Sequence, residues 1–351
     1  MQNKIIKVAQ IGYGYWGDNL LRNLSDLPDV EVVAVCDKDS SKLERIAGHK
    51  RYKEIKTTVN SDDIIKDPTI DAIVVATPTQ THYVIASRCL DEGKSVLVEK
   101  PLTYYPEESL ALIRKAEVAK STLMVGHVFL YNNILLSLRD KVAPGTIRYM
   151  NSQRTGLGPI RLDCNVMWDL APHDISMFNY LTRQKPVSVY ADGRTFVQYD
   201  KGLEDVVFVN LEYPNGIIGH VTTSWIDPIK TRKITVVTSD KMHVFDDVAQ
   251  TLTTFNKGID YQPKSGEYGD FQLSVKDGDI IQPKIVLNEP LKEECKHFID
   301  CVRSKDRPFT EGNRFSAHHT DGKNGYEVVC VLDAAQRSLR NGRRETIKYD
   351  M

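Results

Sequence analysis

Two short stretches of the chain carry residues whose types and spacing could do acid–base chemistry. Glu99-Lys100-Pro101 follows a short apolar run, and a later stretch places Asp169 and His173 four residues apart. Residues four apart share one face of a helix, so the carboxylate could orient the imidazole. Proline after Lys100 fixes the local backbone, which indicates a positioned ammonium group. The spacing therefore predicts a carboxylate-oriented general base at His173.

Other interpretations of the same residues stay open. Asp169 could be the N-cap of a helix with Pro172 in its first turn, and His173 could then be structural. Asp-x-x-x-His on one helix face can also bind a metal, but nothing nearby completes a ligand set, so no metal site is predicted. A lysine at a strand end, such as Lys100, is usually solvated surface.

A glycine-rich turn follows the first apolar run. Gly12, Gly14 and Gly17 form a GxGxxG between a predicted strand and a predicted helix. Gly12 would allow the tight turn, Gly14 the close approach of backbone to a pyrophosphate, and Gly17 close packing of the helix on the sheet. The helix N-terminus would supply N–H donors and a positive dipole for the phosphates. The alternative is an ordinary turn between a strand and a helix.

Asp37 ends the second strand about 20 residues after the turn, where an adenine-ribose diol would bind. Its carboxylate repels a 2′-phosphate, which favours NAD over NADP, although Lys38 could partly offset that repulsion. Two further stretches, Ala76–His82 and Glu99–Pro101, lie at the carboxyl edge of the predicted sheet, where ligands bind in open α/β sheets. The residues predicted to bind the cofactor are Gly12, Gly14, Tyr15, Trp16, Gly17, Asp37, Thr77, Pro78, His82, Glu99 and Lys100.

The elements that must position these residues are short apolar runs alternating with helical spacing over the first 125 residues. Nearly continuous apolar strands indicate burial on both faces, as in a parallel sheet with helices on each side. We therefore expect a doubly wound Rossmann domain over residues 1–126. Its predicted strands are Ile5–Ile11, Glu31–Cys36, Ala72–Ala76, Ser95–Val98 and Thr122–Val125.

From about Pro186 the chain changes to strands separated by turns such as Pro214-Asn215-Gly216. This favours a mostly antiparallel sheet in a second α/β domain, residues 127–351, which returns to helix at its end. In the strand DVVFVNLEY the second face is half apolar, with Val206 and Phe208 on it. Such a face could pack against another subunit.

Composition excludes several classes of protein. The 351 residues include 46 Lys and Arg against 47 Asp and Glu, without a run of like charge, which argues against nucleic-acid and membrane-surface partners. No apolar stretch approaches the roughly 20 residues that would span a bilayer, and the N-terminus lacks the order of a signal peptide. Six scattered cysteines without CxxC spacing predict reduced thiols and a cytoplasmic location.

Several stretches, in their order and spacing, resemble the Gfo/Idh/MocA oxidoreductases: GYGYWG, VCD, ATPTQTH, VLVEKPL, MVGHVFLYNN and WDLAPHD. The C-terminal PLKEECKHFIDCV and GYEVVCVLDAAQRSL are similar too, so the resemblance covers nearly the whole chain. EKP with the later D-x-x-x-H is its specific part, because GxGxxG occurs in unrelated enzymes. The nearest similarity is to members found with nucleotide-sugar and surface-polysaccharide biosynthesis.

The resemblance implies a Rossmann domain, a second domain with a large open sheet, and homodimers or homotetramers assembled through those sheets. It implies hydride transfer between nicotinamide and a sugar or cyclitol hydroxyl. His173 would be the base, Asp169 would orient it or bind a neighbouring hydroxyl, and Lys100 would stabilise the developing alkoxide. The residues expected to contact the substrate are Lys100, Tyr131, Arg154, Asn165, Trp168 and His173.

For these substrate residues the common alternatives are a surface charge for Arg154 and a core aromatic for Tyr131 or Trp168. The run Leu130–Asn133 also replaces an arginine-aromatic-asparagine-proline run of many family members.

The leading hypothesis is an NAD-dependent dehydrogenase of a nucleotide-linked sugar, of the UDP-N-acetylhexosaminuronate 3-dehydrogenase type. The alternatives are a free cyclitol dehydrogenase of the inositol type, an NAD-dependent glycosidase and a non-catalytic NAD-binding regulator. The presence of Lys100, Asp169 and His173 together counts against the regulator, because a sensor needs no proton relay.

Overall fold

The computed structural model describes residues 4–261, 273–304, 315–316 and 318–350. The chain divides into two compact units: unit 1 comprises residues 1–131, 289–333 and 349–351, and unit 2 comprises residues 132–288 and 334–348. The predicted division after residue 126 stays a prediction about domains, and it differs from these units in assigning residues 289–333 to the second domain.

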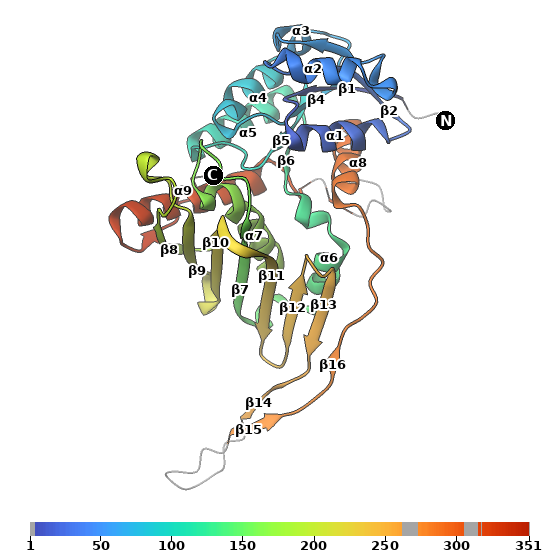
Figure 1. Cartoon of the computed structure of the whole chain (residues 1–351). Helices are drawn as coiled ribbons and strands as arrows, with labels where there is room; N and C mark the ends of the chain where they lie inside the picture. The colour runs from blue at the N-terminus through green and yellow to red at the C-terminus, as the bar shows by residue number, and fades with distance from the viewer. Residues whose placement is uncertain (1–3, 262–272, 305–314, 317, 351) are drawn as a thin grey trace. The chain divides into compact units, whose positions relative to one another are not determined.

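Unit 1 contains a six-stranded parallel sheet in the order β3-β2-β1-β4-β5-β6 (Figure 1). Every residue of β4, β5 and β6 is buried, as the continuous apolar runs predict. The predicted parallel α/β class is therefore confirmed. The strands are β1 (Ile6–Ile11), β2 (Val30–Cys36), β3 (Lys56–Thr58), β4 (Ala72–Val75), β5 (Ser95–Glu99) and β6 (Leu123–Gly126).

Helices of unit 1 follow the strands in the alternating order that parallel pairing requires. The late helix α8 (Pro290–Arg303) also packs in this unit, against α1 and the short 3₁₀ segment η3 (Val128–Tyr131). The other helices are α1 (Tyr15–Ser25), α2 (Ser40–Ala47), α3 (Asp62–Ile65), α4 (His82–Asp91), α5 (Pro106–Ala119) and the first part of α9 (Gly322–Asn341), with 3₁₀ segments at Lys50–Tyr52 and Thr79–Thr81.

Unit 2 contains a nine-stranded sheet in the order β16-β13-β12-β11-β7-β10-β9-β8-β17, and every pairing but that of β10 with β7 is antiparallel. The expected mostly antiparallel sheet is confirmed. Its strands are β7 (Ile147–Leu157), β8 (Ser188–Arg194), β9 (Val206–Glu212), β10 (Ile218–Ser224), β11 (Ile226–Thr238), β12 (Met242–Asp246), β13 (Thr251–Phe255), β16 (Ile280–Ile281) and β17 (Glu345–Thr346), and β14 (Gly258–Tyr261) pairs with β15 (Leu273–Lys276) separately.

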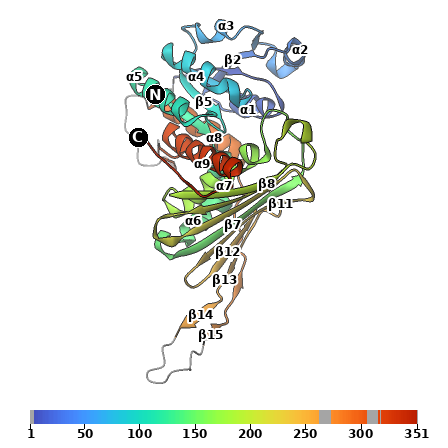
Figure 2. The same ribbon diagram turned by 90° about the vertical axis from the view of Figure 1, so that its left-hand side faces the viewer.

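Helices α6 (Asn133–Lys141) and α7 (Val166–Thr182) cover one face of this sheet (Figure 2). α7 packs on β10, β7 and β9, and α6 packs on β12 and β13. Along β9, Val207, Val209 and Leu211 are buried toward the helices, whereas Phe208 points to the other face and is 43% exposed. The strand alternation predicted from the sequence is therefore confirmed.

Two further expectations concern the whole chain. All six cysteines are buried, and no disulfide joins any of them among the described residues. Among the residues that the structure describes, none of the helices is both long and apolar enough to cross a membrane.

Candidate active site

The glycine turn of unit 1 connects β1 to α1. Gly12 donates from its N–H to the carbonyl of Cys36 at 2.7 Å and has φ of 98°, a left-handed conformation that favours glycine. A Cβ at Gly12 would lie 2.4 Å from the carbonyl oxygen of Ala76. The turn therefore excludes any side chain at this position.

Gly14 is the N-cap of α1, and no side chain caps the helix there. A Cβ at Gly14 would meet no atom within 4 Å, so the space above the first turn is open. A Cβ at Gly17, in contrast, would lie 2.5 Å from the carbonyl oxygen of Gly12. An uncapped helix N-terminus beside open space fits the pyrophosphate of a dinucleotide. Tyr15 and Trp16, also predicted to contact the cofactor, lie in this first turn and are exposed.

Asp37 lies directly after β2 and is buried. Its Oδ2 accepts from the backbone N–H of Tyr13 at 2.7 Å, and its Oδ1 accepts from the N–H of Asp39 at 2.9 Å and from Nζ of Lys42 at 3.5 Å. These donors stabilise a negative charge at the end of the strand. The carboxylate lies at the end of the second strand, and its role as a ribose-binding acid stays a prediction.

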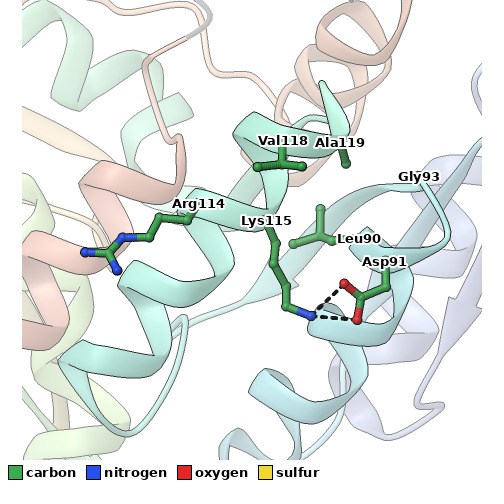
Figure 3. A pocket seen from close by; sticks show the side chains of 7 residues that line it. All are labelled: Leu90, Asp91, Gly93, Arg114, Lys115, Val118 and Ala119. Atoms are coloured by element: carbon green, nitrogen blue, oxygen red, sulfur yellow. Dashed lines mark hydrogen bonds and ion pairs between the residues drawn. The ribbon is translucent and has the colours of Figure 1, made fainter.

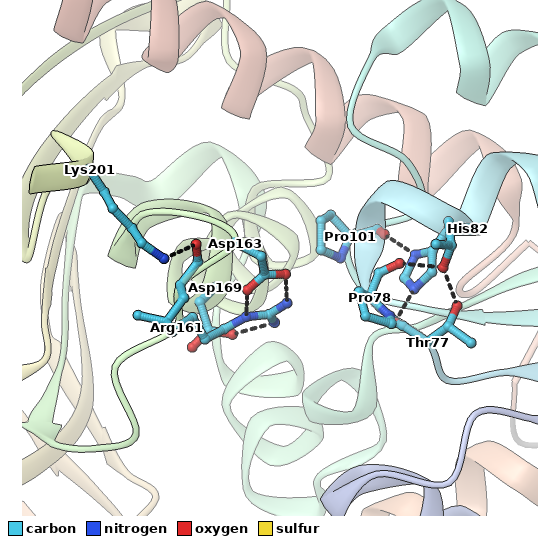
Figure 4. Close-up of polar contacts among 10 residues, drawn as sticks. Thr77, Pro78, His82, Pro101, Arg161, Asp163, Asp169 and Lys201 are labelled. Carbon is cyan, nitrogen blue, oxygen red and sulfur yellow. Dashed lines mark hydrogen bonds and ion pairs between the residues drawn. The ribbon is translucent and has the colours of Figure 1, made fainter. Parts of the chain in front are cut away.

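The predicted cofactor residues after β4 form one hydrogen-bonded group (Figure 4). The buried imidazole of His82 contacts the carbonyl oxygens of Pro101 at 2.9 Å and Thr77 at 2.8 Å. Thr81 donates from its hydroxyl to Oγ1 of Thr77 and to the carbonyl of Pro78. His82 therefore holds the loops after β4 and β5 together, which favours a positioning role for it over direct cofactor contact.

Glu99, the last residue of β5, is buried and accepts two hydrogen bonds. Nε1 of Trp16 donates to its Oε1 at 2.5 Å, and the backbone N–H of Lys100 donates to its Oε2 at 3.1 Å. Burial raises the pKa of the Glu99 carboxyl to about 7, against the stabilising effects of Lys100 and the Trp16 hydrogen bond. The Lys100–Pro101 peptide is cis, and the Lys100 side chain is half-buried.

Sequence reasoning missed two buried polar residues near Glu99. Neither carboxyl oxygen of Glu294 on α8 has a hydrogen-bond partner among the described residues, and burial together with the Glu99 charge raises its pKa well above the usual range. His127 is buried as well, and desolvation followed by the Lys100 charge lowers its pKa to about 3. Glu294 has a sequence signal, because it lies on the apolar stripe of α8 that contains Leu291 and Phe298.

In unit 2, α7 carries the predicted acid–base pair. Asp169 and His173 are half-buried, whereas most of the helix is buried. The interpretation of Asp169 as an N-cap is wrong: the side chain of Asn165 accepts from the N–H of Trp168 at 3.1 Å, so Asn165 caps the helix. Pro172 consequently lies inside α7 rather than in its first turn. Asp169 and His173 still share one side of the helix, as their spacing predicts.

The other predicted substrate residues are placed in cores. Asn165 also donates to Glu204 at 2.7 Å, and Nε1 of the buried Trp168 donates to Gln336 at 3.0 Å. Arg154 is buried and donates from Nε to Oδ2 of Asp174 at 2.7 Å. These placements favour structural roles in unit 2 over substrate contact.

Tyr131 is likewise buried, in unit 1. Its hydroxyl lies 2.7 Å from Nδ1 of His297 and 2.7 Å from Oγ1 of Thr320. Phe315 packs edge-on against its ring. The ring is therefore part of the core, which favours the alternative role weighed from the sequence.

A depression of about 390 Å³ lies between α4 and α5 (Figure 3). Its charged residues include Lys115, which donates to both carboxylate oxygens of Asp91 at 2.6 Å. None of the predicted cofactor, catalytic or substrate residues lines it. The depression therefore has no part in the candidate site.

The glycine turn of unit 1 and the Asp169–His173 pair of unit 2 are the two features from which the sequence predicts a nicotinamide-dependent oxidoreductase. The chain belongs to the Gfo/Idh/MocA family: the family model "Oxidoreductase family, NAD-binding Rossmann fold" matches residues 6–127, and "GFO/IDH/MocA C-terminal domain" matches residues 145–244. The expected family membership and enzyme class are confirmed.

Known proteins similar to this chain include two dehydrogenases. The chain is 27% identical over 259 residues to UDP-N-acetylglucosamine 3-dehydrogenase of Acidithiobacillus ferrooxidans, covering 74% of this chain and 79% of that protein. It is 26% identical over 234 residues to myo-inositol 2-dehydrogenase of Thermotoga maritima, covering 62% and 68% respectively. A solved structure of the Acidithiobacillus enzyme shares the fold, with a TM-score of 0.78 at 21% identity over 95% of this chain and 97% of that one.

Proposed function

We propose that the protein oxidises a sugar hydroxyl with NAD, or reduces the corresponding ketone with NADH. His173 is the general base that takes the hydroxyl proton as hydride leaves the same carbon. The Lys100 ammonium stabilises the alkoxide oxygen that develops, and Asp169 orients His173. NAD, when bound, supplies the nicotinamide carbon that accepts the hydride.

One observation carries this proposal more than any other: Asp169 and His173 are half-buried on one side of a helix that is otherwise largely buried. Ionisable side chains with a purely structural role would be expected to be buried and paired in the core, as Asp174 is on the same helix. The open, uncapped turn at Gly14 supports the cofactor half of the proposal, because the residues there fit a dinucleotide.

For the substrate we propose a nucleotide-linked sugar of the UDP-N-acetylhexosaminuronate type, oxidised at C3 in polysaccharide biosynthesis. The similarity to UDP-N-acetylglucosamine 3-dehydrogenase supports this choice. The similarity to myo-inositol 2-dehydrogenase supports a free cyclitol as the second candidate.

We further propose NAD rather than NADP as the cofactor and a cytoplasmic location. The buried Asp37 carboxylate, with its two backbone donors, supports NAD because a fixed negative charge repels a 2′-phosphate. Six buried cysteines without a disulfide among the described residues support a reducing compartment.

For the oligomer we propose a homodimer or homotetramer formed through the outer face of the unit 2 sheet. Large apolar side chains on four neighbouring strands are exposed on it: Tyr149 on β7, Ile218 on β10, Phe208 on β9 and Tyr190 on β8. An apolar patch of this kind is typical of a protein interface.

The test is turnover of the purified protein with NAD and a panel containing UDP-N-acetylglucosamine, its uronate and myo-inositol, followed by NADH absorbance. His173→Ala and Lys100→Met should each lower kcat by about 10²–10⁴-fold while NAD binding persists. Lys348→Met, a change of an exposed lysine, is the matched control. Near-full turnover of both variants, with NAD bound, would show that the scheme is wrong.

A further inference from the structure

The Arg161 guanidinium contacts two carboxylates of unit 2 (Figure 4). Its Nε and Nη2 donate to the two oxygens of Asp163 at 2.9 and 2.6 Å, and its Nη1 donates to Oδ1 of Asp169 at 3.2 Å. The two bonds to Asp163 use the planar fork that fixes an arginine against a carboxylate. The bond from Nη1 places this fixed cation beside Asp169, a carboxylate of the proposed site.

The three side chains lie where charges are only partly screened by water. Arg161 is 30% exposed, Asp163 32% and Asp169 18%. The hydrogen bond to Asp163, offset by burial, raises the pKa of the Arg161 guanidinium, and the same bond lowers the pKa of Asp163. Both partners therefore stay charged at neutral pH, so Asp169 faces a permanent cation.

The segment that carries Arg161 is held at neighbouring residues. Nζ of Lys201 donates to the carbonyl of Leu162 at 3.2 Å, and Asn165 caps α7 while donating to Glu204. The bond from Arg161 to Asp169 thus joins a tethered segment to the first turns of α7. A cation fixed in this way can orient a carboxylate as well as neutralise it.

We propose that Arg161 is a positioning residue for Asp169: it keeps that carboxylate ionised and aimed, and Asp163 anchors the guanidinium in place. This inference rests on the proposed function, in which Asp169 orients His173. Arg161 acts through Asp169 and is not itself a catalytic residue. Nothing in the sequence pattern distinguishes Arg161 from an ordinary surface arginine.

The charges around Asp169 determine whether each substitution raises or lowers the pH at which Asp169 is protonated. Arg161 attracts Asp169, whereas Asp163 repels it. His173 lies one turn along the same helix, and Lys201 and Glu204 flank the segment. Removing Arg161 leaves the repulsion from Asp163, so protonation of Asp169 should move to higher pH. Removing Asp163 should have the opposite sign.

The experiment is the pH profile of kcat/KM for wild type, Arg161→Gln, Asp163→Asn and the double variant. The acid limb, to which both His173 and Asp169 contribute, should move up by about one pH unit in Arg161→Gln and down in Asp163→Asn, and it should return toward wild type in the double variant. Arg161→Lys should recover the limb position but not the full kcat, because lysine lacks the fork. Arg194→Gln is the matched control, since Arg194 pairs with Asp192 two residues away.

A second readout needs no turnover. Carbon-13 NMR of aspartate carboxyls in the free protein follows Asp169 directly, and Asp169→Asn identifies its signal. In Arg161→Gln, the carboxyl signal of Asp169 should titrate at higher pH than in wild type. An unmoved signal and an unmoved acid limb, in a folded Arg161→Gln variant, would overturn the inference. If Asp169→Asn keeps full turnover, the proposed function fails, and the NMR titration still decides the role of Arg161.

Discussion

Trp16 donates a hydrogen bond of 2.5 Å from its indole Nε1 to Oε1 of Glu99, which joins the first turn of α1 to the carboxyl end of β5. The bond links the two sequence motifs of unit 1, the glycine turn and EKP, although they lie 83 residues apart. Because the indole N–H favours the ionised carboxylate and burial favours the protonated one, Glu99 is held between its two states near neutral pH.

Trp16 should report the ionisation of Glu99. We expect tryptophan emission of the free protein to change with a midpoint near pH 7, the pKa of the Glu99 carboxyl. The change should vanish in both Trp16→Phe and Glu99→Gln, because Trp168 and Trp225 are buried elsewhere. A fluorescence titration that persists unchanged in Glu99→Gln would contradict this assignment.

Glu294 should make the protein less stable as pH rises. Its raised pKa means that the folded chain retains a proton that the unfolded chain releases above about pH 4.3, so the stabilisation is lost as pH rises above that value. Glu294→Gln should therefore nearly match wild type near pH 4 and exceed it by about 1–3 kcal/mol near pH 8. Urea unfolding at both pH values measures this, with Glu293→Gln on the same helix as control. A constant difference between the pH values would contradict it.

Two glycines of the turn should separate folding from cofactor binding. Gly12→Ala should destabilise the protein by about 1–3 kcal/mol or more, because of the positive φ and the contact with Ala76. Gly14→Ala should leave the free energy of unfolding nearly unchanged but weaken NAD binding at least tenfold, since its methyl group enters the open space. Thermal unfolding and NAD titration distinguish the two effects. Equal NAD affinity in Gly14→Ala would show that the cofactor lies elsewhere.

The buried Arg154–Asp174 pair should be costly to break. Arg154→Ala leaves Asp174 buried without its cation, so we expect a loss of about 3–5 kcal/mol. Replacing both residues with Met and Leu should cost less than the single change, because no unpaired charge remains. Denaturant unfolding of the single and double variants measures the difference. If Arg154→Ala loses little stability but has a raised KM, the result would indicate instead that Arg154 contacts the substrate.

The outer face of the unit 2 sheet should hold the oligomer together. Phe208→Glu places a charge in the middle of the exposed apolar side chains on β7 to β10, and the protein should become monomeric by light scattering. Phe196→Glu, which changes an exposed phenylalanine outside the strands, is the control. An unchanged oligomer in Phe208→Glu would place the interface on another surface.

Local patterns predicted most of unit 1. The strand expected at Ile5–Ile11 is observed at Ile6–Ile11, because a fully buried parallel strand leaves a continuous apolar run in the sequence. The edge strand β3, Lys56–Thr58, has no such run, since it is short and partly exposed. The long strand β7 was not anticipated, because its position between β10 and β11 depends on pairing with residues far along the chain.

The candidate site was predictable where its geometry is local. The glycine turn and the four-residue spacing of Asp169 and His173 each lie within a short stretch of sequence. The hydrogen bond between Arg161 and Asp169 depends instead on the path of an irregular segment, which residue types do not specify. The capping role of Asn165 was missed for a related reason, because several residues before α7 are suitable caps.

Unit 1 is discontinuous in sequence, and this sets an order for its synthesis. Helix α8, which packs against α1 and η3, leaves the ribosome only after residues 132–288 have been made. The α1 surface that α8 covers in the folded unit therefore stays uncovered while residues 132–288 are synthesised. Translation speed and chaperone access over that interval should govern the yield of folded enzyme, and an N-terminal fragment expressed alone would lack the helix that completes it.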